Sequence, residues 1–253
     1  MTKRPPVTLA TAATVGVVFL VLPLVGLLVR APWSDLPSLV TAPAARTALR
    51  LSLECSFGAL VLALVTGVPL AWLLARKDFP GKSLVRALVT VPLVLPPVVG
   101  GVALLFAFGR RGVIPLHLAF TTWGAIAAEA FVAMPFLVLA VEGALAALDE
   151  RYEDVATTLG AGPLSTFRRV TLPLVGPGVA AGAALAWARA LGEFGATITF
   201  AGNLPGTTQT LPLYVYVQLQ TDPDAAVATS VLLLAVSLLL LVALRGRWRV
   251  TRS

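Results

Sequence analysis

The sequence predicts an all-α integral membrane protein with six transmembrane helices and both termini in the cytoplasm. Of its 253 residues, 58% are hydrophobic and only 12% are charged, which is about half the charged fraction of a soluble domain. Six apolar stretches are long enough to cross a bilayer as helices. Lysine and arginine residues gather on one side of these stretches. Length, charge content and charge distribution therefore favour a membrane protein.

The six expected spans follow from the thickness of a bilayer core, about 30 Å, which about 20 helical residues cross. Backbone polar groups find no water in lipid, so the spans should be helical. Leu95-Pro96-Pro97 should break the third span, either at a cavity or as a plain kink. We expect one transmembrane domain over residues 1–253, with spans at 8–29, 48–75, 87–108, 122–143, 177–200 and 226–244.

The first span resembles a secretion signal, since Lys3 and Arg4 precede it. Its apolar run is too long for an ordinary signal and no small-residue cleavage site follows, so we expect the helix to be retained. With this topology, thirteen Lys and Arg residues lie on the side of the termini and five on the other. The positive-inside rule places that basic side in the cytoplasm. The net charge of +7 is thereby explained without a nucleic-acid partner.

The chain carries few residues suited to catalysis or metal binding. Cys55 is its single cysteine and His117 its single histidine, which excludes thiolate clusters and paired-histidine metal sites. No Gly-x-x-x-x-Gly-Lys-Ser/Thr phosphate loop occurs, so no nucleotide site of that kind is expected. We expect neither a catalytic residue nor a metal ligand.

The loop between the fourth and fifth spans, residues 144–174, has helical periodicity. Leu145, Leu148, Tyr152, Val155 and Leu159 are spaced as one apolar helical stripe. Acidic residues lie near the start of that helix, where its dipole favours them. Gly160 is suited to end it, and a short second helix is expected over residues 164–170. This pattern alone is equally compatible with a docking surface and with a connector that packs on its own bundle.

The loop also resembles the EAA loop of ABC-importer permeases. That motif has an acidic residue, Ala two residues later and Gly four residues after the Ala, and it ends in aliphatic-x-Leu-Pro. Here Asp replaces the usual Glu and Val155 the first Ala, which preserves the negative charge and the apolar character. The residues that carry the resemblance are Asp154, Ala156, Gly160, Val170, Leu172 and Pro173.

The resemblance implies a type I ABC-importer permease fold in which a short helix inserts into a separate ATP-binding subunit. Gly160 would be the hinge, and residues 164–170 the coupling helix. Phe167 would be its apolar anchor, with Arg168 and Arg169 at the rim. The implied ATPase-coupling loop comprises Asp154, Ala156, Gly160, Ala161, Leu164, Phe167, Arg168, Arg169, Val170, Leu172 and Pro173.

Residues 188–220 resemble the fifth span and outer loop of molybdate and tungstate permeases, and less closely those of sulfate and thiosulfate permeases. The resemblance implies a homodimer in membrane lipid, a dimer of ATP-binding subunits that carries the ATP, and an extracytoplasmic molybdate-binding protein. This chain would bind no cofactor and would be a transport subunit rather than an enzyme. An ion-coupled secondary transporter would instead predict internal repeats or proton relays, and a membrane enzyme a catalytic cluster. Neither is found.

The fifth span holds four candidate pore or gate residues: Arg189, Glu193, Thr197 and Thr199. Arg189 and Glu193 are four residues apart and can form an ion pair. That pair would either face the permeation path or join two helices. Glu193 would not attract an oxyanion, which favours pairing or gating over binding. The threonines either offer hydroxyls to a passing oxyanion or bond their own backbone.

Overall fold

The computed structural model describes residues 7–114 and 116–245, in which every regular element is a helix. The elements are α1 (Val7–Arg30), α2 (Leu36–Thr41), α3 (Pro43–Arg76), α4 (Lys82–Val94), α5 (Pro97–Phe108), α6 (Thr122–Ala146), α7 (Arg151–Thr158), α8 (Pro163–Thr166), the π-helical segment η1 (Phe167–Thr171), α9 (Leu172–Leu191), α10 (Gly195–Phe200), α11 (Leu211–Thr221) and α12 (Pro223–Arg245).

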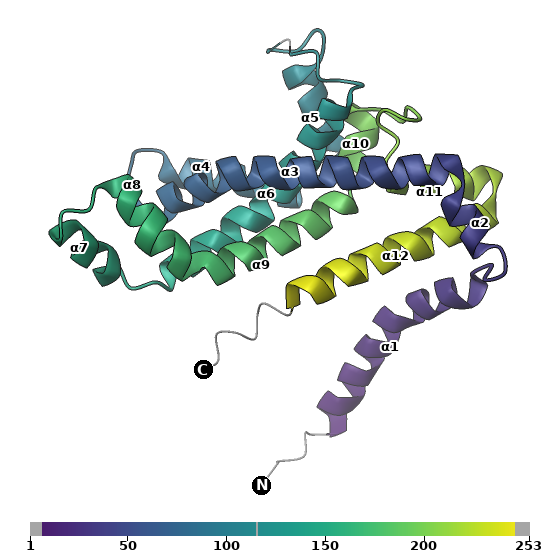
Figure 1. Ribbon diagram of the computed structural model, residues 1–253, viewed down its shortest axis with the longest axis horizontal. Coiled ribbons are helices and arrows are strands. Elements are labelled where there is room, and N and C mark those ends of the chain that lie inside the picture. The colour runs from purple at the N-terminus through teal and green to yellow at the C-terminus, as the bar shows by residue number, and fades with distance from the viewer. Residues whose placement is uncertain (1–6, 115, 246–253) are drawn as a thin grey trace.

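Helices α3, α6, α9 and α12 run side by side and form the main bundle (Figure 1). Its core combines large aliphatic side chains such as Leu74 and Leu137 with many alanines. Small residues let the helices approach closely. At Gly182 of α9, an added Cβ would lie 2.8 Å from the Cβ of Ala140 in α6. The alanine-rich and glycine-rich sequence of the fifth span is therefore explained by its packing against α6.

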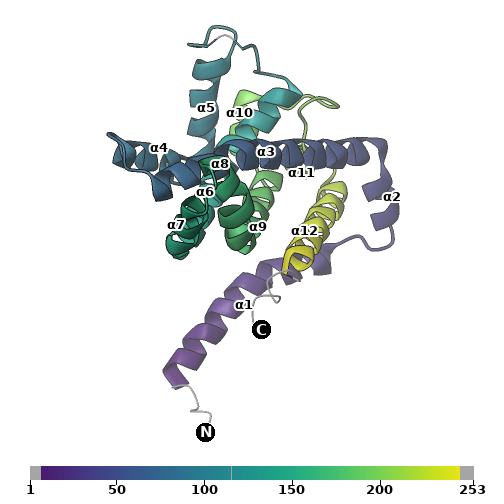
Figure 2. The ribbon, with the colours of Figure 1, turned by 60° about the vertical axis from the view of Figure 1, so that its left-hand side comes forward.

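Helix α1 diverges from the bundle in both ribbon views (Figures 1 and 2). None of its residues is buried, and its main contact in the bundle is with α12. An apolar helix of 24 residues in this position must be covered by lipid or by another chain.

The third predicted span is broken as expected. Helix α4 ends at Val94 and α5 begins at Pro97, because proline lacks an N–H group and disfavours helical backbone in the residue before it. After the break, α5 projects away from the main bundle (Figures 1 and 2). The span therefore consists of two helices at a steep angle.

The fifth predicted span differs from the expectation at its start and in its continuity. Its helix begins well before residue 177, and it is interrupted between Leu191 and Gly195. Helix α10 then packs beside α5, and an added Cβ on Gly195 would lie 2.9 Å from the Cβ of Pro97. The breaks in the third and fifth spans thus lie next to each other.

Five helical stretches of the described chain are long and apolar enough to cross a membrane, and α5 is a shorter apolar helix. The remaining predicted span, the third at residues 87–108, corresponds to the broken α4–α5 pair. Lys3, Arg4, Arg247, Arg249 and Arg252, which contribute to the predicted orientation, lie outside the described residues. The cytoplasmic location of both termini therefore stays a prediction.

Candidate functional site

The loop at residues 144–174 connects α6 to α9 at one end of the main bundle (Figure 1). The predicted apolar stripe does not lie on a single helix, because α6 ends at Ala146 and α7 starts at Arg151. Leu145 is buried in the bundle core, and Leu148 packs against that core. The rest of the stripe is exposed on α7 and just after it, at Tyr152, Val155 and Leu159.

Helix α7 ends at a left-handed glycine, as the sequence predicts. Gly160 has φ +85°, a conformation that residues with a Cβ rarely adopt. The N–H of Gly160 donates to the carbonyl of Thr157, and the N–H of Ala161 donates to that of Ala156. This pair of hydrogen bonds is the Schellman motif. Ala156 and Ala161 therefore contribute to the loop through their backbones.

The predicted helix at residues 164–170 is not separate from the fifth span. Helix α8, the π-helical segment η1 and α9 follow one another without a gap from Pro163 to Leu191. Leu172 donates its N–H to the carbonyl of Phe167, five residues earlier. Pro173 has no N–H to donate, and a local π turn accommodates such a gap in the hydrogen-bond ladder. Val170, Leu172 and Pro173 lie at the transition into α9.

The two faces of the α8–η1 segment differ in chemistry. Leu164 is exposed, and with Ser165, Arg168 and Arg169 it lines a hollow of about 560 Å³. Asp154 is also exposed, on α7. This outward surface combines apolar side chains with two arginines, a composition typical of protein interfaces.

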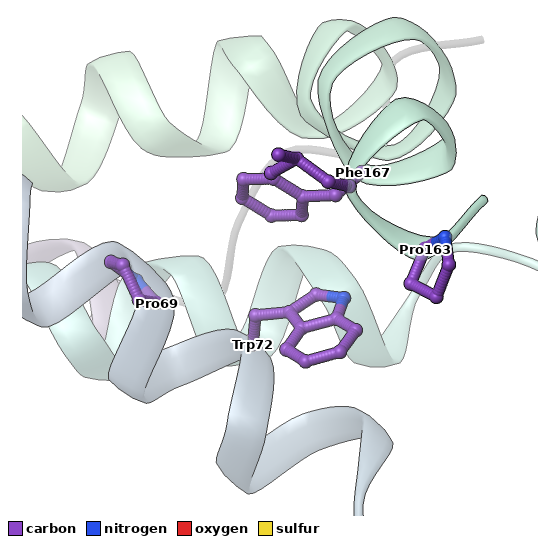
Figure 3. Close-up of a pocket in the computed structure, with 5 residues that line it drawn as sticks. Pro69, Trp72, Pro163 and Phe167 are labelled. Carbon is purple, nitrogen blue, oxygen red and sulfur yellow. The ribbon is translucent and has the colours of Figure 1, made fainter.

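Phe167 lies on the side of the segment that faces α3. Its ring contacts Trp72 of α3 edge to face, with 6.0 Å between the ring centroids (Figure 3). The two rings line an apolar cavity of about 310 Å³ together with Pro69, Pro163 and Leu164. Phe167 thus packs within the chain, and its proposed role as an anchor in another subunit stays a prediction.

An ionic network that the sequence analysis did not identify joins α3 to the loop. The guanidinium of Arg76 donates through Nε to Glu153 Oε2 at 2.9 Å and through Nη1 to Glu150 Oε1 at 3.2 Å. The hydroxyl of Thr171 donates to Glu153 Oε1 at 2.5 Å. Arg76 and Glu153 are 77 residues apart, so no local spacing rule connects them. The one cue in the sequence is that Arg76 ends an apolar span and that a second cytoplasmic loop is expected to carry acidic residues.

The predicted pairing of Arg189 with Glu193 is confirmed. Arg189 Nη2 lies 2.6 Å from Glu193 Oε2, and only 1% of the Glu193 side chain is exposed. The other carboxylate oxygen, Oε1, accepts a hydrogen bond from the N–H of Ala196 at 2.7 Å. Glu193 therefore stabilises the break between α9 and α10, because it accepts from the backbone N–H of Ala196, which has no partner within α10.

The two threonines of the predicted gate differ in their hydrogen bonding. Thr199 donates its hydroxyl to the carbonyl of Gly195 at 2.7 Å, which is the backbone alternative considered above. Thr197 is buried, and its hydroxyl has no hydrogen-bond partner among the described residues. A role for these residues in a pore or gate stays a prediction.

Comparison with known proteins identifies the family. Residues 67–248 match the family model described as binding-protein-dependent transport system inner membrane component. The chain is 48% identical over 210 residues to the molybdenum transport system permease protein ModB of Mycobacterium tuberculosis, which covers 80% of both chains. It is 37% identical over 218 residues to the sulfate transport system permease protein CysT of Salmonella typhimurium, covering 82% of this chain and 79% of the relative.

The fold matches that of a solved transporter. A chain of the bacterial alginate ABC transporter, in complex with an alginate pentasaccharide-bound periplasmic protein, superposes with a TM-score of 0.76 at 18% identity. The match covers 97% of this chain and 96% of that chain, and it confirms the predicted type I ABC-importer permease fold. The chain is thus a multi-pass protein of the inner membrane and belongs to the family of binding-protein-dependent transport system inner membrane components.

Proposed function

We propose that this chain is the pore-forming permease subunit of an ATP-driven importer that moves molybdate or tungstate across the cytoplasmic membrane. The observation that carries the proposal is the loop at residues 144–174. It exposes Tyr152, Val155, Leu159 and Leu164 beside two arginines, at the end of the bundle where the basic residues between spans gather. Exposed apolar groups that are clustered and rimmed by charge mark interaction surfaces.

The partner at this surface is a separate ATP-binding subunit. The sequence contains no phosphate loop of the Gly-x-x-x-x-Gly-Lys-Ser/Thr type, which supports a partner that holds the ATP. Two such subunits would bind two copies of the permease. The α1 helix supports a homodimer in lipid, since none of its residues is buried within its own chain.

Transport then proceeds by alternating access. Closure of the ATPase pair displaces the loop, and η1 passes this displacement directly into α9, because the helical path from Pro163 to Leu191 has no gap. An extracytoplasmic molybdate-binding protein delivers the ion to the outer side. The similarity to ModB at 48% identity supports molybdate over sulfate, for which the relative is 37% identical.

The test is reconstitution of this chain with a candidate ATP-binding subunit and binding protein in lipid vesicles. Molybdate, tungstate and sulfate are offered in separate arms, and both ion uptake and ATP hydrolysis are measured. We expect molybdate or tungstate to stimulate hydrolysis and to accumulate inside. Stimulation by sulfate alone would replace the substrate assignment with the sulfate alternative. Uptake without any ATPase would show that the chain is a secondary transporter.

A further inference from the structure

Arg76 is the last residue of α3, yet its side chain is only 7% exposed. Its guanidinium bonds to Glu153 and Glu150 and also donates through Nη2 to the carbonyl of Leu148 at 3.3 Å. A guanidinium has five donors in a fixed plane, so it can hold several acceptors in one geometry. All three acceptors belong to the stretch that ends α6 and starts α7. The C-terminal end of α3 is therefore fastened to α7.

Glu153 extends this attachment to η1. One of its oxygens accepts from Arg76, and the other accepts from the hydroxyl of Thr171 in η1. Thr171 is 1% exposed, so its hydroxyl is shielded from water. A single carboxylate thus bridges α3 and η1, and hydrogen bonds to a charged group are the stronger kind.

A second contact between α3 and the loop is apolar. Trp72 precedes Arg76 by one helical turn, which places both side chains on the same face of α3. Trp72 packs edge to face against Phe167 of η1 (Figure 3). The last turn of α3 therefore contacts the loop at two points, one ionic and one aromatic.

We infer that Arg76 and Glu153 are positioning residues that make α3 move with the coupling loop when the ATPase displaces it. The inference rests on the proposed function, since it presupposes that the loop is displaced by an ATPase. Helix α9 is joined to the loop by continuous backbone. Helix α3 is far from the loop in the sequence and is joined to it by side chains. With the network intact, α3 moves with the loop as α9 does; without it, the displacement reaches α3 only through its packing against α6 and α9.

The functional test uses a charge exchange in the reconstituted complex. The variants are Arg76→Glu, Glu153→Arg and the double exchange, and the readout is the amount of oxyanion imported per ATP hydrolysed. We expect each single variant to lower this ratio at least about fivefold and the double exchange to restore it to within about threefold, as for directly coupled residues. Thr171→Val, a milder change of similar volume, should lower the ratio less than either single reversal.

The matched control is Lys82→Glu. Lys82 pairs with Asp78 at 2.9 Å near the same end of the bundle, but Asp78 is fully exposed. The control makes the same kind of charge change without touching Arg76 or the loop, and it should leave the import ratio unchanged. An unchanged ratio in both single reversals would overturn the inference. A lowered ratio that the double exchange does not restore would also overturn it, since the paired charges would then not be the cause.

A distance measurement tests the motion without depending on the transported ion. Spin labels are placed at Leu73→Cys in α3 and Arg151→Cys in α7, with the native Cys55 replaced by Ser. We expect one narrow distance distribution that is the same without nucleotide and with trapped ATP, and a broader one after Arg76→Glu. In the labelled protein with Arg76 and Glu153 intact, a change of this distance on ATP binding would refute the coupled motion. That result would stand even if the transport assay supported the proposed function. Absence of ATP-driven import of all three oxyanions, with the distance unchanged, would refute the proposed function instead.

Discussion

The left-handed glycine at the end of α7 provides a quantitative test of the coupling loop. Gly160 has φ +85°, and no described atom lies within 4 Å of the position that a Cβ would take. A substitution there therefore changes backbone strain without a steric clash. A residue with a Cβ costs about 1–2 kcal/mol in this conformation. Since 1.4 kcal/mol corresponds to a tenfold change in an equilibrium constant, Gly160→Val should raise the Kd for the ATP-binding subunit by about 5- to 30-fold.

The assay is titration of the purified ATP-binding subunit onto permease in lipid nanodiscs. Gly160→Asn is the first control, because asparagine tolerates left-handed backbone better than valine, and it should weaken binding less. Gly162→Ala is the second control, since Gly162 lies two residues away at φ −71° with equally open space around it. It should bind like the unaltered chain. Equal Kd values for Gly160→Val and Gly162→Ala would refute the argument that the left-handed turn shapes the docking surface.

Three further outcomes are expected. Gly195→Ala should lower the free energy of unfolding by about 1–3 kcal/mol, because its Cβ would lie 2.9 Å from the Cβ of Pro97. Thermal or denaturant unfolding measures this change. Gly176→Ala is the control and should leave the free energy of unfolding unchanged, because the space around Gly176 is open. Glu193→Gln should lower thermal stability, since a buried partner of Arg189 loses its charge; stability equal to that of the unaltered chain would contradict this. Burial raises the pKa of Tyr214, with a smaller contribution from the nearby Asp222. The neutral phenol of Tyr214 therefore stabilises the fold fully below the ordinary tyrosine pKa of about 10, and this stabilisation is lost as the pH rises through the raised pKa. The fall in Tm from pH 9 to pH 11 should therefore be smaller in Tyr214→Phe than in the unaltered chain. Equal falls in the two proteins would refute this.

The parts of the fold that the sequence predicts well are those set by composition and by backbone chemistry. Apolar runs locate the long helices, because bilayer thickness fixes how many residues they need. The break at Pro97 and the turn at Gly160 are predicted because proline and glycine restrict or free the backbone at their own positions. These features depend on a single residue and its immediate neighbours.

The parts that the sequence did not reveal depend on residues that meet only in the folded chain. The break between α9 and α10 is held by Glu193, which accepts from the backbone of Ala196, and the apolar character of the fifth span conceals it. The inward position of Phe167 depends on Trp72, which lies in a helix far away in the sequence. The stripe from Leu145 to Leu159 has helical spacing, but the chain turns between α6 and α7. The spacing happens to stay regular across this turn, so it wrongly predicted one continuous helix.

The π-helical segment η1 has a consequence for how the length of this loop is constrained. A π turn contains one residue more than an α-helical turn, and each residue rotates a helix by about 100°. Deleting one residue between Phe167 and Thr171 would convert the turn to regular α-helix and leave Leu164 facing nearly the same direction relative to α9, because both kinds of turn complete one rotation. Deleting one residue from the α-helical turns of α9 removes no such surplus, so it would rotate Leu164 and the arginines beside it by about 100° relative to the rest of α9. A single-residue deletion should therefore be tolerated within η1 and not in α9, because the winding of the helix sets the direction in which the exposed surface of α8 faces.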